Sequence, residues 1–150
     1  MPVDEFGLIR RLTGGRSGAE IGNGVVIGIG DDAAVVAPTP GMQMVLTCDT
    51  MVDQTDFLPW TMDDYSIGWK AMAQNVSDLA AMGAMPRYAL VALSAPRGFD
   101  EARLERLYEG LYACAGEYAL TIIGGDMSGA PEHLCVTVTA VGEVEAGRAV

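Results

Sequence analysis

Five aspartates occupy positions where a metal ion and a phosphate group could meet. Asp31, Asp32, Asp49 and Asp126 follow short apolar segments that we expect to be strands, and Asp78 lies inside an amphipathic segment. Magnesium takes about six oxygen ligands and commonly uses one or two carboxylates together with waters and substrate phosphates. We therefore expect the fold to gather these aspartates into one cluster that binds a metal–nucleotide complex.

Glycines precede two of these acidic sites. Gly28 and Gly30 stand before the first pair of aspartates, and Gly124 and Gly125 stand before the last aspartate. Glycine lets the backbone approach a phosphate closely and adopt torsions that other residues avoid. The first pair lacks the further glycine of a dinucleotide-binding fingerprint, and the chain has no G-x-x-x-x-G-K-[ST] segment, so we exclude Rossmann and P-loop sites.

A simpler interpretation is that each aspartate only caps a helix or stabilises a turn, which is the commoner role of a single Asp-Gly pair. Asp78 argues against it, because Asp78 and Asn75 fall within the otherwise apolar stripe of a predicted helix. An unpaired buried carboxylate is costly. We therefore expect a metal or another cation to compensate Asp78.

The elements that position these residues follow from apolar spacing and from turn residues. Helices are predicted at 5–12, at 64–82 with Thr61 and Asp64 forming a capping box, and after Asp100 as far as Tyr118. The glycine-rich stretch 14–24 should end the first helix as a mobile loop. This mixture, without strict strand–helix alternation, predicts an α+β fold with a mixed β-sheet and helices packed on one face. Strands are predicted at 25–29, 33–37, 44–47, 88–95, 121–124 and 134–141.

Composition limits the classes of partner. The 150 residues suit one domain, and 20 acidic against 9 basic residues give a net charge of -11. This charge argues against nucleic acids and anionic membranes as partners. The three cysteines show neither disulfide nor metal-ligand spacing, and the start is neither a signal peptide nor a membrane span. We therefore expect a cytoplasmic protein.

Six segments in order resemble the thiamine-monophosphate kinase family, within a larger group that includes aminoimidazole ribonucleotide synthetase and selenophosphate synthetase. NVSDLAAMGA and IGGD are typical of the larger group, whereas the EF-LI opening and GIGDDAA point to the kinase branch. The resemblance covers nearly all of the chain. The segments are EFGLIRRL, GIGDDAAV, TCDTMVD, GWKAMAQNVSDLAAMGAMP, IIGGDMSG and GEVEAGRAV.

The resemblance implies an ATP-dependent enzyme that phosphorylates thiamine monophosphate to thiamine diphosphate with magnesium bridging the phosphates. Phosphoryl transfer needs positioning and charge neutralisation more than a covalent nucleophile, so no catalytic side chain is assigned and His133 receives no role. The implied contacts with the nucleotide are Gly125, Asp126, Arg148 and Tyr108. The implied metal ligands are Asp32, Thr47, Cys48, Asp49, Asp78 and Asp126.

Two positions depart from the family pattern. Cys48 stands where a hydroxyl would be available to magnesium, and sulfur is a poor ligand for that ion, although the backbone carbonyl could still coordinate. Asp56 replaces a histidine that contacts substrate in the family's V-x-x-x-H-F stretch. Asp56 is therefore the implied substrate-binding position at which specificity could differ.

The resemblance also implies an assembly. Residues 1–150 would be the amino-terminal domain, ending in a linker to a carboxy-terminal domain outside this chain, and its sheet would pair with that of a second subunit in a barrel-like homodimer core. The fragment alone would bind metal weakly without turnover. A selenophosphate synthetase-like enzyme is disfavoured, since no reactive Cys with a nearby Lys occurs near the start. A non-catalytic dimerisation module would show no magnesium-dependent nucleotide binding.

Overall fold

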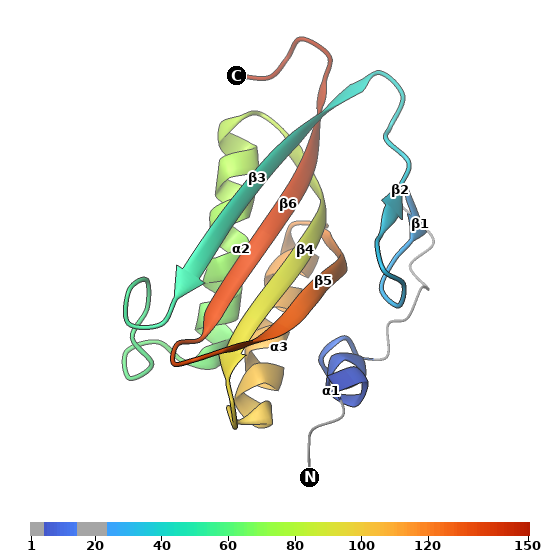
Figure 1. Ribbon diagram of the computed structural model, residues 1–150. Helices are drawn as coiled ribbons and strands as arrows, with labels where there is room; N and C mark the ends of the chain where they lie inside the picture. Colours follow the sequence, from blue (N-terminus) through green and yellow to red (C-terminus); the bar gives the residue numbers. More distant parts are fainter. Residues whose placement is uncertain (1–4, 15–23) are drawn as a thin grey trace.

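A four-stranded mixed sheet is the centre of the molecule (Figure 1). The computed structural model describes residues 5–14 and 24–150. In spatial order the strands are β3 (Met42–Val52), β6 (Cys135–Glu145), β4 (Met85–Pro96) and β5 (Thr121–Ala130). Strands β4 and β5 run parallel, whereas β6 is antiparallel to both of its neighbours. The predicted α+β class with a mixed sheet is confirmed.

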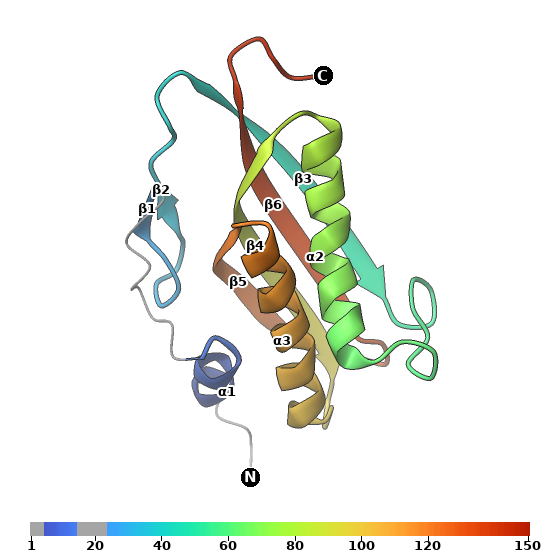
Figure 2. The ribbon, with the colours of Figure 1, turned by 180° about the vertical axis from the view of Figure 1, so that it is seen from behind.

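Two helices cover one face of this sheet, as predicted (Figure 2). Helix α2 (Asp64–Ala81) begins at the N-cap Asp63, whose carboxylate accepts a hydrogen bond from the amide of Ser66, rather than at the predicted box around Thr61. Gly83, with φ of +71°, follows the end of this helix. Helix α3 (Glu101–Glu117) begins at the predicted N-cap Asp100.

The two helices approach closely because each carries a glycine at the crossing. A Cβ atom on Gly68 would lie 1.9 Å from the carbonyl oxygen of Leu107, and one on Gly110 would lie 2.0 Å from that of Tyr65. Both distances are far shorter than a van der Waals contact. The helix layer therefore depends on the absence of a side chain at these two positions.

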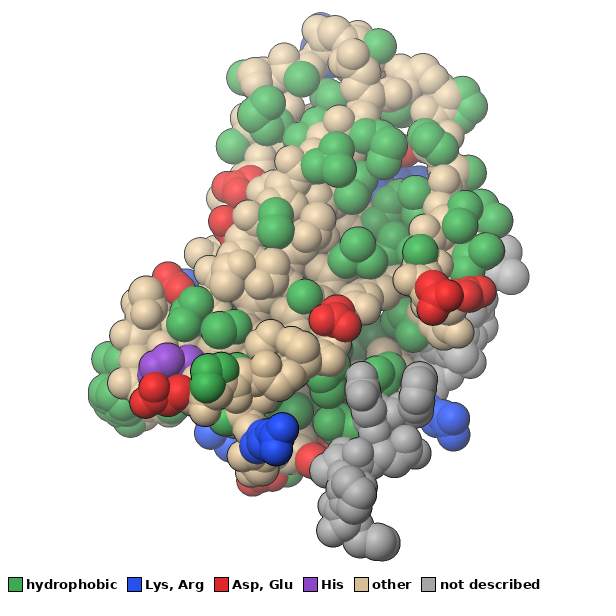
Figure 3. Space-filling model, viewed as in Figure 1, with side chains coloured by type: hydrophobic (Ala, Val, Ile, Leu, Met, Phe, Trp, Pro, Cys, Tyr) green, Lys and Arg blue, Asp and Glu red, His purple; other side chains and the backbone are tan. Residues whose placement is uncertain are grey.

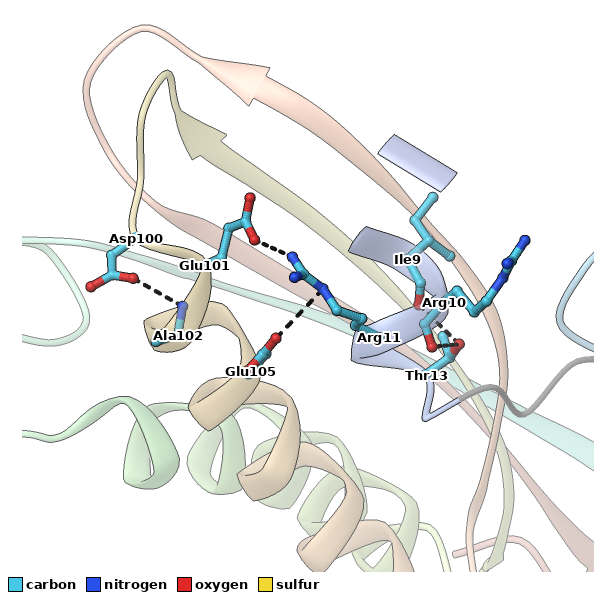
Figure 4. Close-up of polar contacts among 8 residues, drawn as sticks. All are labelled: Ile9, Arg10, Arg11, Thr13, Asp100, Glu101, Ala102 and Glu105. Atoms are coloured by element: carbon cyan, nitrogen blue, oxygen red, sulfur yellow. Dashed lines mark hydrogen bonds and ion pairs between the residues drawn. The ribbon is translucent and has the colours of Figure 1, made fainter. Parts of the chain in front are cut away.

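A short third helix, α1 (Glu5–Leu12), packs against α3 through Leu8 and Leu12, which are both buried. Arg11 pairs with Glu101 and lies 3.7 Å from Glu105 (Figure 4). These ion pairs are exposed and contribute little stability by themselves. The apolar contacts of Leu8 and Leu12 therefore anchor the helix.

A small hairpin lies outside the main sheet and beside its uncovered side (Figures 1 and 2). Its strands are β1 (Val25–Ile27) and β2 (Val35–Val36), both shorter than predicted. Val25 packs with Tyr88 of β4 and Ile123 of β5 in a small buried cluster. The predicted glycine-rich loop falls almost wholly outside the described residues.

All four strands of the main sheet extend beyond their predicted ends. The segments around Asp49 and Asp126 were expected to be turns that follow strands, but both lie within strands, since β3 continues to Val52 and β5 continues to Ala130. Their side chains therefore follow the alternation of a pleated sheet instead of gathering at one edge. In the described part of the chain, no helix has the length and apolar character needed to cross a membrane.

Candidate functional site

Alternation along β3 sends neighbouring predicted ligands to opposite faces of the sheet. Thr47 and Asp49 pair with Ala140 and Val138, which are fully buried under the helices. Cys48 points the other way, where its sulfur accepts a hydrogen bond from the hydroxyl of Thr139 at 3.3 Å. The Cys48 side chain therefore cannot ligate a metal ion together with Thr47 and Asp49.

Asp78, on α2, contacts β3 on the face of the sheet that the helices cover. The hydroxyl of Thr47 donates a hydrogen bond to the Asp78 carboxylate at 2.8 Å. Asp49 and Asp78 also line one open hollow between this strand and the helix. The expectation that Asp78 is buried and needs a compensating cation is wrong, because its side chain is exposed and already holds a hydroxyl donor.

Three polar residues of this hollow were not predicted from the sequence. Lys70, Gln74 and Ser77 line it together with Asp49 and Asp78. Lys70 and Gln74 precede Asp78 by eight and four residues, a helical spacing that could have identified them. The buried side-chain oxygen of Gln74 has no hydrogen-bond partner among the described residues, so it is an available acceptor at the wall of the hollow.

Asp126 lies at the other edge of the sheet and on its other face. It pairs with Ala92 of β4, Ala92 pairs with Thr137 of β6, and Thr137 pairs with Thr50 of β3. Asp126 is therefore on the same face of the sheet as Thr50, which is the face opposite to that of Asp49. Three strand spacings of about 4.8 Å put β3 and β5 roughly 14 Å apart. Magnesium–oxygen bonds are about 2.1 Å long. Asp126 therefore cannot share a magnesium ion with Asp49 inside one chain.

Asp32 belongs to neither of these places. It is exposed in the turn of the hairpin, where its amide donates a hydrogen bond to the carboxylate of Asp31 at 2.9 Å. The expected single cluster of aspartates is therefore not formed within this chain, and the described residues contain no group of three acidic, His or Cys side chains able to hold a metal ion. Thr47, Asp49 and Asp78 are brought together, whereas Asp32, Cys48 and Asp126 are not.

Asp56 closes a tight loop after β3. Its carboxylate accepts a hydrogen bond from the amide of Val52 at 2.8 Å, and its carbonyl oxygen accepts one from the ammonium group of Lys70 at 3.1 Å. Phe57 is buried next to it. The loop that carries the predicted substrate position is thus connected through Lys70 to the hollow.

The predicted nucleotide contacts come from three parts of the chain, since Gly125 and Asp126 are in β5, Tyr108 is in α3 and Arg148 follows β6. Gly125 is needed for the close approach of β5 to β4, since a Cβ there would lie 1.9 Å from the carbonyl oxygen of Val91. Tyr108 is 8% exposed in the core, where burial and the neighbouring Tyr112 raise the pKa of its hydroxyl. This setting does not support direct nucleotide contact for Tyr108. Arg148 is exposed in the segment after β6.

The residues around the hollow could supply only some of the ligands that a magnesium ion needs. Asp49, Asp78 and the hydroxyl of Thr47 offer hard oxygen atoms, which magnesium prefers. Two carboxylates suit an ion that keeps its remaining positions for waters and phosphate oxygens. The cationic Lys70 in the same hollow is suited to a phosphate oxygen.

The fold and these motifs define a known class. The family model described as "AIR synthase related protein, N-terminal domain" matches residues 30–144. The chain belongs to this family. Its curated relatives include the thiamine-monophosphate kinases of Bacillus subtilis (strain 168), 40% identical over 147 residues and 98% of this chain, and of Haemophilus influenzae, 37% identical over 150 residues and 100% of this chain. The resemblance inferred from the motifs is confirmed.

Solved structures give the same result. Thiamine-monophosphate kinase from Stenotrophomonas maltophilia K279a superposes with a TM-score of 0.81 at 39% identity, over 98% of this chain and 44% of that one. A structure of AaThiL complexed with AMPPCP and TMP superposes with a TM-score of 0.68 at 29% identity, over 94% of this chain and 42% of that one. The chain spans 44% of the length of both curated relatives.

Proposed function

We propose that this chain is the amino-terminal, magnesium- and nucleotide-handling domain of a thiamine-monophosphate kinase, which transfers the terminal phosphoryl group of ATP to thiamine monophosphate. The observation that carries the proposal is the hollow between α2 and β3, where Asp49 and Asp78 lie with Lys70 in a chain similar to such kinases along nearly all its length. The AaThiL structure, described as a complex with AMPPCP and TMP, supports this choice of substrates.

The chain's own residues would position phosphates rather than attack them. Thr47, Asp49 and Asp78 would hold magnesium, which neutralises charge on the phosphates when bound. Lys70 would contact a phosphate oxygen, and its hydrogen bond to the Asp56 carbonyl would set the loop on which substrate is expected. Asp32, Asp126 and Arg148 would act from outside this hollow, on other parts of the metal–nucleotide complex.

The uncovered face of the sheet supports the proposed homodimer. Exposed apolar side chains lie on this face and on the adjoining hairpin (Figure 3). Isolated sheets bury such a face against another layer. A second copy of the same face would supply that layer and close a barrel-like core, with Asp126 at the covered surface. The exposed residues are Met44, Leu46 and Leu90 on the sheet, and Val26, Ile27 and Val35 on the hairpin.

The complete enzyme would be longer than this chain. The relatives are more than twice as long as the part that matches, which supports a carboxy-terminal domain joined through the segment after β6. That domain would add substrate contacts, so the 150-residue chain alone should bind metal weakly without turnover. All three cysteines are free thiols, which supports a reducing cytoplasm.

The decisive experiment uses the full-length protein with magnesium-ATP and thiamine monophosphate. Formation of thiamine diphosphate is expected, and Asp78→Asn should reduce it by at least about a hundredfold, since removing one stabilising charge from a phosphoryl-transfer site commonly costs that much. Asp100→Asn is the matched control, because asparagine caps a helix as well as aspartate does. An active Asp78→Asn variant would remove Asp78 from the mechanism.

Assays of the same full-length protein distinguish the two alternative functions. A selenophosphate synthetase-like enzyme would consume ATP with a selenium donor and leave thiamine monophosphate unchanged. A dimerisation module would bind no nucleotide in the presence of magnesium, whatever the acceptor. Binding of AMPPCP with and without magnesium therefore separates the module from either enzyme.

A further inference from the structure

Glu143 is the one buried side chain with a charge in the described part of the molecule. It is 3% exposed, and the other buried polar side chain, Asn75, is neutral. Glu143 pairs with Met44 of β3 and Met85 of β4, so it points to the face of the sheet that the helices leave uncovered. Nothing in the proposed kinase mechanism uses this carboxylate.

The segment between β2 and β3 covers Glu143. Thr39 donates two hydrogen bonds to it, one from the backbone amide to Oε1 at 2.8 Å and one from the hydroxyl to Oε2 at 2.7 Å. Arg87 of β4 approaches the same carboxylate with its Nε atom, at 3.3 Å. A carboxylate that binds both donors of one threonine fixes the backbone of that threonine in orientation as well as in position.

Thr39 in turn lies on the connection that holds the acidic hairpin. The amide of Ala37 donates a hydrogen bond to the carbonyl of Gly24 at 2.7 Å, closing the base of the hairpin. On the other side of Thr39, the amide of Met42 bonds to the Thr39 carbonyl at 3.1 Å as β3 begins. Among the described residues, the hairpin is also attached to the main sheet through the buried cluster of Val25 with Tyr88 and Ile123.

The apolar contacts of Val25 and Ile123 hold the hairpin near the sheet without setting its angle, because apolar contact is not directional. Hydrogen bonds to a buried carboxylate are directional and lose strength when the donor tilts. The two attachments together define where the hairpin turn, with Asp31 and Asp32, stands relative to β3 and β5.

We propose that Glu143 is a positioning residue, which holds Thr39 and thereby fixes the hairpin so that Asp32 meets the magnesium–nucleotide complex. The inference rests on the proposed function, which supplies the reaction. Glu143 would act through Thr39 and Asp32 and would not itself touch substrate.

The test compares Thr39→Val with Thr50→Val in the full-length protein. Each change removes one hydroxyl hydrogen bond on the uncovered face, since Thr50 bonds to Thr137 at 2.8 Å, but only Thr39 touches Glu143. Amide hydrogen exchange in residues 31–41 should rise roughly three- to tenfold in Thr39→Val, the factor that one hydrogen bond is worth. The magnesium concentration for half-maximal AMPPCP binding should rise by a similar factor. Thr50→Val should change neither quantity.

Further variants separate positioning from general stability. Thr39→Ser keeps the hydroxyl and should restore both quantities to parental values, whereas Glu143→Gln, which keeps the shape without the charge, should raise both. Unchanged exchange in Thr39→Val and Glu143→Gln would overturn the tether. Raised exchange with an unchanged magnesium requirement would overturn the positioning role.

The readouts also keep this inference apart from the kinase assignment. A parent protein that binds AMPPCP with magnesium but does not phosphorylate thiamine monophosphate would refute the kinase alone, and the tether would still be judged by exchange and magnesium requirement. A parent that binds no AMPPCP with magnesium would refute both.

Discussion

The Thr47 hydroxyl donates a hydrogen bond to the Asp78 carboxylate at 2.8 Å, and this contact joins β3 to α2 beside the hollow. Both residues are predicted metal ligands, and they are 31 positions apart in the sequence. A hydroxyl that already orients a carboxylate reduces the reorganisation needed when a cation binds. Under the proposed function, this contact would preorganise the place where Thr47 and Asp78 meet.

Thr47→Val should weaken magnesium binding without unfolding the protein. Asp78 is exposed, so water can replace the lost donor, and the free energy of unfolding should fall by no more than about 1 kcal/mol. The magnesium concentration for half-maximal activity of the full-length enzyme should rise roughly three- to tenfold, since the hydroxyl is lost both as donor and as ligand. Urea unfolding and magnesium titration measure the two effects. An unchanged magnesium requirement would exclude Thr47 from the site.

Gly68→Ala and Gly110→Ala should each destabilise the helix layer. Their Cβ atoms would lie 1.9 and 2.0 Å from carbonyl oxygens of the facing helix, so the helices must separate. Overpacking of this kind costs about 1–3 kcal/mol or more. Gly116→Ala in α3 is the matched control, because no atom lies within 4 Å of its Cβ position. There alanine should stabilise by about 0.5–1 kcal/mol through helix propensity. Equal urea midpoints for all three variants would contradict the close crossing.

The helices, the N-cap of α3 and the glycine after α2 follow from local patterns, which explains why they could be predicted, whereas the predicted cap of α2 at Thr61 was wrong. Asp100 caps α3 and Gly83 follows α2 because an N-cap carboxylate and a glycine after a helix act on their own neighbourhood. The strand lengths were underestimated for the same reason. Cys48-Asp49-Thr50 and Gly124-Gly125-Asp126 have turn-forming composition, but hydrogen bonds to β6 and β4 keep them extended.

The arrangement of the predicted ligands could not be derived locally. Asp49 and Asp126 are at opposite edges because the strand order is β3-β6-β4-β5, and that order depends on pairings between distant segments. The two carboxylates also lie on opposite faces of the sheet. A register shift of one residue in either strand would place them on the same face. Asp78 and Thr47 were brought together as expected, since a helix that follows its strand packs back on it.

Cysteine labelling should report whether a second copy covers the open face. Cys48 is exposed on that face, whereas Cys114 is buried and its pKa is raised to about 11 by burial and by Glu117. A monomer should therefore be alkylated at Cys48 and not at Cys114. A dimer should protect Cys48, and Leu46→Lys, which places a charge on the same face, should restore its labelling together with the monomeric mass.

The outcome that would contradict the dimer is equally clear. Peptide mass spectrometry would find Cys48 labelled at the same rate in the parent and in Leu46→Lys, with one oligomeric mass for both. Leu58→Lys is a suitable control, because Leu58 is exposed on the loop after β3 and away from the sheet face. It should leave both mass and labelling unchanged.

Glu143 should contribute a defined part of the acid sensitivity of this fold. Burial raises the pKa of its carboxyl, but the amide and hydroxyl of Thr39 and the nearby Arg87 together outweigh that effect, so the pKa is lowered from its ordinary value of 4.5. A lowered pKa means that the folded state favours the charged form. The resulting stability is present above pH 4.5 and is lost as the pH falls through the lower pKa of the folded state.

The variant Glu143→Gln has no carboxyl at this position to titrate, and the other carboxylates are common to both proteins. The difference in free energy of unfolding, parent minus variant, should therefore be constant well above pH 4.5 and should then decrease as the pH falls below that value. Urea unfolding of both proteins across this range measures the difference. If it does not change with pH, the carboxylate is not held in its charged form by Thr39 and Arg87.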